Sequence, residues 1–182
     1  MKTEILTNSG EYFNFLDPQN SVIDINDIGR ALSKICRFTG HTNEFYSVAQ
    51  HSVLVSYAVP EQLALTGLLH DATEAYLGDV SAPLKQLLPD YKALESKIEA
   101  VILQRFKLPE TLPTEVKIAD LILLATEKRD LMPDYFSIQK NDAWQCIQDI
   151  KPLASRIKPL SHQDAYDMFM CRFAQLIYQS GG

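Results

Sequence analysis

Apolar side chains recur every three or four positions through most of this chain, and that spacing places them on one face of an α-helix. Asp24 and Ser47 stand where two of these periodic segments begin, and both residue types commonly cap helices. Gly78 follows the third segment and suits the position just after a helix. The patterns predict helices over residues 24–36, 47–60, 61–77, 83–88, 91–106, 114–130 and 161–178. We therefore expect an all-α fold.

Two parts of the chain depart from the helical pattern. Short β-prone segments within residues 4–15 flank the turn residues Asn8-Ser9-Gly10, which predicts a small N-terminal β-hairpin, an appendage within residues 1–20. From residue 131 to 160 the periodicity is lost and prolines interrupt the chain, so we expect an irregular segment with at most one short helix near Trp144. Since no linker or repeat divides the chain, residues 1–182 are predicted to form a single domain.

Composition excludes several classes of protein. The net charge is −6 and no run of Lys or Arg stands out, which disfavours a nucleic-acid partner. No segment approaches the ~18 apolar residues of a membrane span, and the start does not resemble a signal peptide. Three widely spaced cysteines are typical of reduced thiols. We expect a cytoplasmic protein without a membrane partner. Exposed-looking apolar residues in the hairpin and in segment 131–160 also predict a homo-oligomer.

Polar side chains stand at four positions where the apolar pattern expects burial. They are His51, His70, Asp71 and Asp120, and they come from three different predicted helices. Burying carboxylates beside imidazoles is costly unless a cation neutralises them. A mixed nitrogen and oxygen set suits Mn, Fe, Co, Ni or Zn better than Ca or Mg. The sequence therefore predicts one divalent transition metal, which would make a nucleophile of bound water at neutral pH.

Glu74 lies one helical turn beyond His70 and Asp71, where it could hold or deprotonate that water. Simpler interpretations exist for the single residues. His51 alone is more commonly a core histidine, and Asp120 could form a buried ion pair with Arg37 or Arg129. The order and spacing of the four residues favour the metal. We expect the charged run at residues 127–130 to be a solvated helix end.

The order His, His-Asp, Asp resembles that of the HD-domain metal-dependent phosphohydrolases. The closer likeness is to the branch that contains bacterial 5′-deoxynucleotidases and phage dATP triphosphohydrolases, and it covers roughly residues 22–130. The motifs of that branch are present here as Arg37-Phe38, His51, His70-Asp71, Glu74, Gly78-Asp79, Pro83, Lys85 and Asp120. The resemblance implies an HD-domain helical bundle and hydrolysis of a deoxynucleoside phosphate.

The resemblance also implies roles for individual residues. Glu74 would move protons around the attacking water, and Asp79 would assist it or contact the sugar. Arg37 and Lys85 would hold phosphate oxygens, where fixed cations are needed. The residues implied to contact the substrate are Arg37, Phe38, Gly40, Pro83 and Lys85. Phe38 stands where the family often has Trp, and the neighbouring Gly40 is small, so base selectivity is open.

Three functions follow from these expectations. The first is a dATP or dNTP triphosphohydrolase that releases deoxynucleoside and triphosphate. The second is a 5′-deoxynucleotidase that acts on dNMPs. The third is a non-catalytic, metal-stabilised module that senses nucleotide. Glu74 favours catalysis, because a purely structural metal site has no use for an additional carboxylate. A nuclease is disfavoured by the acidic charge balance.

Overall fold

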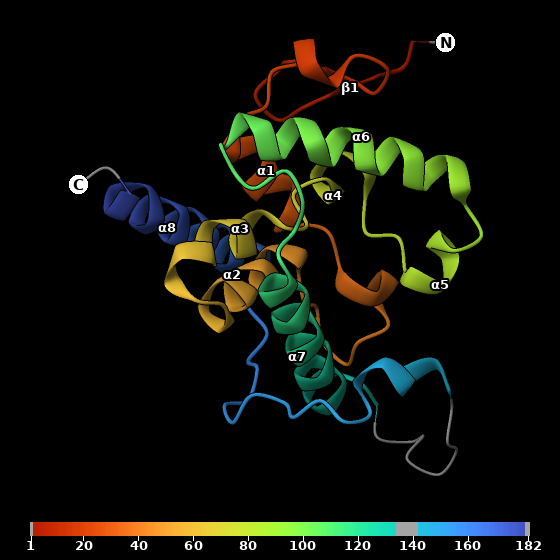
Figure 1. The fold of residues 1–182 in the computed structure, drawn as a ribbon, viewed down its shortest axis with the longest axis vertical. Coiled ribbons are helices and arrows are strands. Elements are labelled where there is room, and N and C mark those ends of the chain that lie inside the picture. Colours follow the sequence, from red (N-terminus) through yellow and green to blue (C-terminus); the bar gives the residue numbers. More distant parts are fainter. Residues whose placement is uncertain (1, 134–141, 181–182) are drawn as a thin grey trace.

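Helices make up most of the chain in this computed structural model, which describes residues 2–133 and 142–180 (Figure 1). The mostly helical prediction is confirmed. The helices are α1 (Ile25–Leu32), α2 (Val48–Ala58), α3 (Ala64–Leu69), α4 (Glu74–Leu77), α5 (Ala82–Lys85), α6 (Pro89–Arg105), α7 (Thr114–Leu131) and α8 (His162–Ser180). Among the described residues, none of these helices combines the length and apolarity that crossing a bilayer requires.

Local capping sets several helix ends. The side chain of Asp24 accepts a hydrogen bond from the Asn26 amide at the start of α1, and Ser47 accepts one from Gln50 at the start of α2. Gly78 closes α4 with φ of 78°, a left-handed conformation that glycine adopts without strain. These ends were predicted because each depends on residues close in sequence.

The predicted continuous helix over residues 61–77 is wrong. A 3₁₀ turn precedes α3, and a second turn, residues 70–73, separates α3 from α4. In that turn the Glu74 amide donates to the Asp71 carbonyl at 3.0 Å, a bond between residues three apart. The His70 ring donates from Nδ1 to the Gly67 carbonyl at 2.8 Å. The ring thus takes a carbonyl that a continuing α-helix would pair with the Asp71 amide.

The predicted hairpin is confirmed. Strand β1 (Glu4–Leu6) pairs antiparallel with β2 (Tyr12–Asn14), and Ile5 lies opposite Phe13. Phe13 is fully buried and stacks on Tyr76 of α4, with ring centroids 4.0 Å apart. The hairpin therefore leans on the helices, as two strands alone require. Leu6, Tyr12 and Leu16 are exposed, and association of copies through them stays a prediction.

The segment predicted to be irregular contains one short 3₁₀ helix in its described part, Asp142–Ile147, which includes Trp144. Residues 148–160 then run without helix or strand to the start of α8. The remainder of the predicted irregular segment, residues 134–141, lies outside the described residues. Cys36, Cys146 and Cys171 are free, in agreement with the expectation of unpaired thiols.

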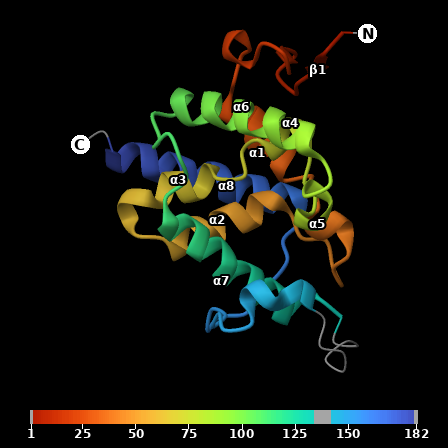
Figure 2. The same cartoon turned by 45° about the vertical axis from the view of Figure 1, so that its right-hand side comes forward.

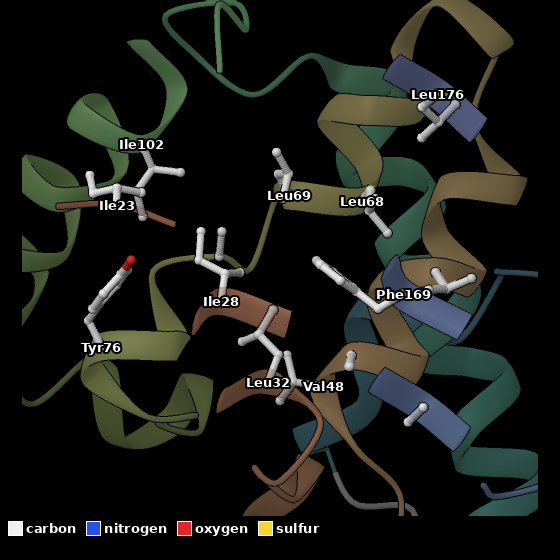
Figure 3. Close-up of a cluster of buried hydrophobic side chains, with 14 of the residues drawn as sticks. Ile23, Ile28, Leu32, Val48, Leu68, Leu69, Tyr76, Ile102, Phe169 and Leu176 are labelled. Atoms are coloured by element: carbon white, nitrogen blue, oxygen red, sulfur yellow. The ribbon is translucent and has the colours of Figure 1, made fainter. Parts of the chain in front are cut away.

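Helix α2 contacts α3, α7 and α8, and Figures 1 and 2 both show it between α7 and α8. Ile28 of α1, Leu68 of α3 and Phe169 of α8 are fully buried and gather in one cluster (Figure 3). Burying each such side chain contributes about 1.5–3 kcal/mol. A separate buried cluster joins Val55 of α2 to Leu123 of α7. These two clusters fix α3 and α7 against α2, and thereby position the polar residues those elements carry.

Candidate metal centre

Three packed segments bring the four predicted metal ligands together. His51 comes from α2, His70 and Asp71 from the turn after α3, and Asp120 from α7. His51 Nε2 lies 3.3 Å from His70 Nε2, 3.2 Å from Asp120 Oδ1 and 3.5 Å from Asp71 Oδ2. One ligand atom each of His51, His70 and Asp120 falls within 4.8 Å of the others. These three residues could hold a metal ion, whereas Asp71, the fourth predicted ligand, lies outside that group.

Hydrogen bonds orient both imidazoles toward the centre. His51 Nδ1 lies 2.6 Å from Glu127 Oε1, and His70 Nδ1 donates to the Gly67 carbonyl. With each Nδ1 engaged, the Nε2 atoms are left to face one another and the two carboxylates. Fixing a ligand ring through its other nitrogen is the usual support for a metal-binding histidine. The donor set therefore fits a divalent transition metal.

The charges of the centre also favour a cation. Burial and the nearby Arg37 alone would lower the pKa of His51, but Glu127 and Asp120 outweigh them and raise it to about 10. Burial alone would raise the pKa of Asp120, but the hydrogen bond and the charge of His51 hold it well below its usual range. Both shifts reflect the attraction between a positively charged His51 and the carboxylates that it contacts, which raises the pKa of the imidazole and lowers that of Asp120.

Arg37 is the cation nearest to this centre. Its NH2 lies 3.1 Å from Glu127 Oε2 and 4.0 Å from Asp120 Oδ1, and its NH1 lies 3.4 Å from Asp71 Oδ2. Arg37 begins a 3₁₀ turn, Arg37–Gly40, in which Phe38 has φ of 55°. A left-handed phenylalanine is strained, and such strain is common at functional sites. The Arg37–Asp120 contact means that the ion-pair and metal interpretations of Asp120 are compatible.

A cavity of about 190 Å³ adjoins the candidate metal centre. Its lining includes His70 and Asp71, together with Glu74, Lys85 and two glutamates of α6, Glu95 and Glu99. Glu74 is buried, and its Oε2 has no hydrogen-bond partner among the described residues. Burial and the charges of Asp71 and Asp79 raise the pKa of Glu74 well above its usual value. A carboxyl group in this state can exchange a proton with a molecule in the cavity.

The remaining predicted residues lie around this site in different ways. Lys85 Nζ lies 4.0 Å from Glu74 Oε1 and 2.6 Å from Glu95 Oε1, so its charge is already paired. Asp79 is partly buried, and burial raises its pKa. Phe38, Gly40 and Pro83 do not line the described cavity. Their predicted contacts with a substrate stay predictions.

Glu127 was missed by the sequence reasoning. The expectation that residues 127–130 form a solvated helix end is wrong for this residue, which is fully buried and contacts both His51 and Arg37. Its position could have been found from helical spacing, because it follows the inward-facing Leu123 by four residues and Asp120 by seven. Arg129, in contrast, pairs with the adjacent Asp130.

The fold and the centre together define a mostly helical protein with a His/Asp group that could hold a metal ion. No protein-family profile matches the chain. It is 49% identical over 173 residues to YfdR, an uncharacterized protein of Escherichia coli K12, with 94% of each chain covered. It is 37% identical over 119 residues to an uncharacterized protein of Rhodobacter capsulatus, covering 60% of this chain and 61% of that protein. The chain therefore belongs to the YfdR family.

Proposed function

We propose that this protein is a metal-dependent phosphohydrolase of the HD-domain type that acts on 2′-deoxynucleoside 5′-phosphates, with dATP and other dNTPs as the leading substrates. The observation that carries the proposal is the convergence of His51, His70, Asp71 and Asp120 beside a cavity that contains a buried carboxyl group, Glu74. The order of these residues along the chain resembles that of HD-domain phosphohydrolases.

The residues of the centre divide the chemistry between them. A divalent ion such as Mn, Fe, Co, Ni or Zn would acidify water and so supply a nucleophile near neutral pH. Glu74 would accept the proton of that water. Asp79 would assist the same water or contact the sugar. In a dNTP the water adds to the α-phosphorus and the bond from that phosphorus to O5′ breaks. The proton held by Glu74 then passes to O5′, and deoxynucleoside and triphosphate are released.

The charge of the cavity constrains how an anionic substrate binds. Asp71, Glu74, Glu95 and Glu99 line it, and Lys85 is the cation among the lining residues that the structure describes. Phosphate oxygens would be repelled unless a metal and Lys85 or Arg37 offset those carboxylates. Substrate phosphate would therefore compete with Glu95 for Lys85, and with Asp71 for Arg37.

A second candidate is a 5′-deoxynucleotidase that hydrolyses dNMPs. The same acidic lining favours it, because a monophosphate brings fewer negative charges into the cavity than a triphosphate. The reaction would then release inorganic phosphate, and the proton of the water would again leave through Glu74 to O5′. The two candidates share every residue assigned here and differ in their products.

Product analysis with a matched pair of variants tests the proposal. Purified protein is incubated with Mn²⁺ or Co²⁺ and with each of the four dNTPs and dNMPs, and triphosphate, phosphate and deoxynucleoside are measured. We expect the wild type to form products and Asp71→Ala to form at least about 10²-fold less, since it lacks a metal ligand. His162→Ala removes an exposed histidine at the start of α8 and should keep wild-type activity.

Each outcome has a definite meaning. Triphosphate with deoxynucleoside supports the leading candidate, and phosphate with deoxynucleoside supports the second. Equal rates for wild type and Asp71→Ala would overturn the assigned site. Saturable nucleotide binding without any product would instead favour the non-catalytic sensing module.

A further inference from the structure

Glu127 connects the proposed metal centre to Arg37, the nearest cation. Its Oε1 lies 2.6 Å from His51 Nδ1, and its Oε2 lies 3.1 Å from Arg37 NH2. The side chain is fully buried, so solvent does not screen either contact. A single carboxylate thus holds a predicted metal ligand on one side and a guanidinium on the other.

Arg37 is held where it would share carboxylates with a bound metal ion. Its guanidinium lies 3.4 Å from Asp71 Oδ2 and 4.0 Å from Asp120 Oδ1, and its side chain is only 11% exposed. Because two cations would then draw on the same acidic groups, the charge of Arg37 opposes metal binding. The carboxylate of Glu127 acts in the opposite sense, since it makes His51 a stronger donor and offsets the Arg37 charge.

We propose that Glu127 is a positioning residue that sets the metal affinity of the centre through His51 and Arg37, with Glu127 strengthening metal binding and Arg37 weakening it. The inference rests on the proposed metal centre. It has a consequence for substrate binding, because an anion that neutralises Arg37 relieves its repulsion of the metal. Metal and phosphate group then bind with positive coupling, each favouring the other.

The test is a measurement of metal affinity, which needs no substrate. Metal-stripped protein is titrated with Mn²⁺ and with Zn²⁺ against a competing chelator, and thermal melting checks that each variant is folded. We expect Glu127→Gln to weaken metal binding by about 10- to 100-fold, as loss of a supporting carboxylate generally does. We expect Arg37→Gln to tighten it by about fivefold or more, within the range of ordinary coupling free energies.

The inference predicts opposite effects of Glu127→Gln and Arg37→Gln on metal affinity. If both residues had a merely structural role, both substitutions would weaken metal binding. Arg37→Lys keeps the positive charge and should stay close to the wild-type affinity. Two controls are matched in charge: Glu115→Gln changes an exposed glutamate of the same helix as Glu127, and Lys34→Gln changes an exposed lysine. Neither control should alter metal affinity.

The outcomes separate the two proposals. Absence of metal binding by the wild type overturns the proposed function and, with it, this inference. If the wild type binds metal, unchanged or weakened binding by a folded Arg37→Gln overturns the inference and leaves the metal centre standing. Should Glu127→Gln fail to fold, comparison of Arg37→Gln with Arg37→Lys still shows whether the charge of Arg37 weakens or strengthens metal binding.

Discussion

His51 Nε2 and His70 Nε2 lie 3.3 Å apart, although 19 residues separate the two histidines along the chain. Two neutral imidazoles that approach in this way present lone pairs to each other, which is unfavourable without a shared proton or cation. Packing of α3 against α2 brings them to this distance. The metal-stripped protein can satisfy the pair with a proton, and this gives the centre a measurable pH dependence.

The first prediction concerns the stability of the metal-stripped protein between pH 6 and 10. The pKa of His51 is raised from 6.5 to about 10, so its protonation stabilises the fold fully below pH 6.5. That contribution is lost as the pH rises through 10, by up to about 1.4 kcal/mol per pH unit. Chemical denaturation after chelator treatment should show this decline. His51→Asn should flatten it, and His162→Ala should retain it. A wild-type profile that is level over this range would contradict the assignment.

The second prediction separates catalysis from metal binding. Glu74→Gln keeps the size of the side chain but removes its capacity to take a proton, and the group lines the cavity beside the ligands. We expect product formation to fall by about 10²–10⁴-fold, the usual contribution of general acid–base catalysis. Metal content, measured by elemental mass spectrometry, should stay at the wild-type level. Glu115→Gln is the exposed control. Substantial activity in Glu74→Gln would remove this residue from the proton path.

The parts of the fold that the sequence predicted are those with local causes. The starts of α1 and α2 follow from the capping residues Asp24 and Ser47, and the hairpin follows from its turn. The break after α3 was not predicted, because apolar periodicity continues through it. The break accompanies the hydrogen bond from the His70 ring to the Gly67 carbonyl. The orientation of that ring depends on contacts with residues of other helices, such as His51.

In the candidate site, too, the residues that could be predicted are those with a local sequence signal. His51 and Asp120 were found because each is a polar residue on an otherwise apolar helix face. Glu127 was missed because it begins a charged run, and Glu95 and Glu99 were missed because charged residues on α6 are typical of a solvated face. Their burial or cavity position depends on packing between segments far apart in sequence, which periodicity does not report.

The third prediction concerns the irregular segment that leads to α8. Gln50 is buried next to His51; its Nε2 donates to the Lys158 carbonyl at 2.8 Å, and its Oε1 accepts from the Leu160 amide at 2.9 Å. Gln50→Ala leaves both backbone groups without that partner, so we expect a loss of about 2–4 kcal/mol in the free energy of unfolding. Gln163→Ala, at an exposed position of α8, should change it by less than about 0.5 kcal/mol. Denaturant titration of the two variants compares them directly; equal stabilities would mean that this segment is not held by Gln50.

The last prediction tests how closely α2 and α3 must approach for the centre to form. A Cβ added at Gly67 would lie 3.2 Å from the Ser56 Cα and 3.1 Å from Val59 Cγ2. The valine side chain can rotate away, but the backbone of α2 has to move. Alanine would gain up to about 1 kcal/mol in helix propensity, whereas overpacking typically costs about 1–3 kcal/mol, so we expect Gly67→Ala to be net destabilising.

The same substitution should also affect the metal, because Gly67 supplies the carbonyl that orients the His70 ring. We expect both a lower melting temperature and weaker Mn²⁺ binding in Gly67→Ala. Thr66→Ala, at the preceding buried position of α3, should lower stability without weakening metal binding to the same extent. If Gly67→Ala bound Mn²⁺ as tightly as the wild type while melting earlier, the spacing of α2 and α3 would matter for stability alone.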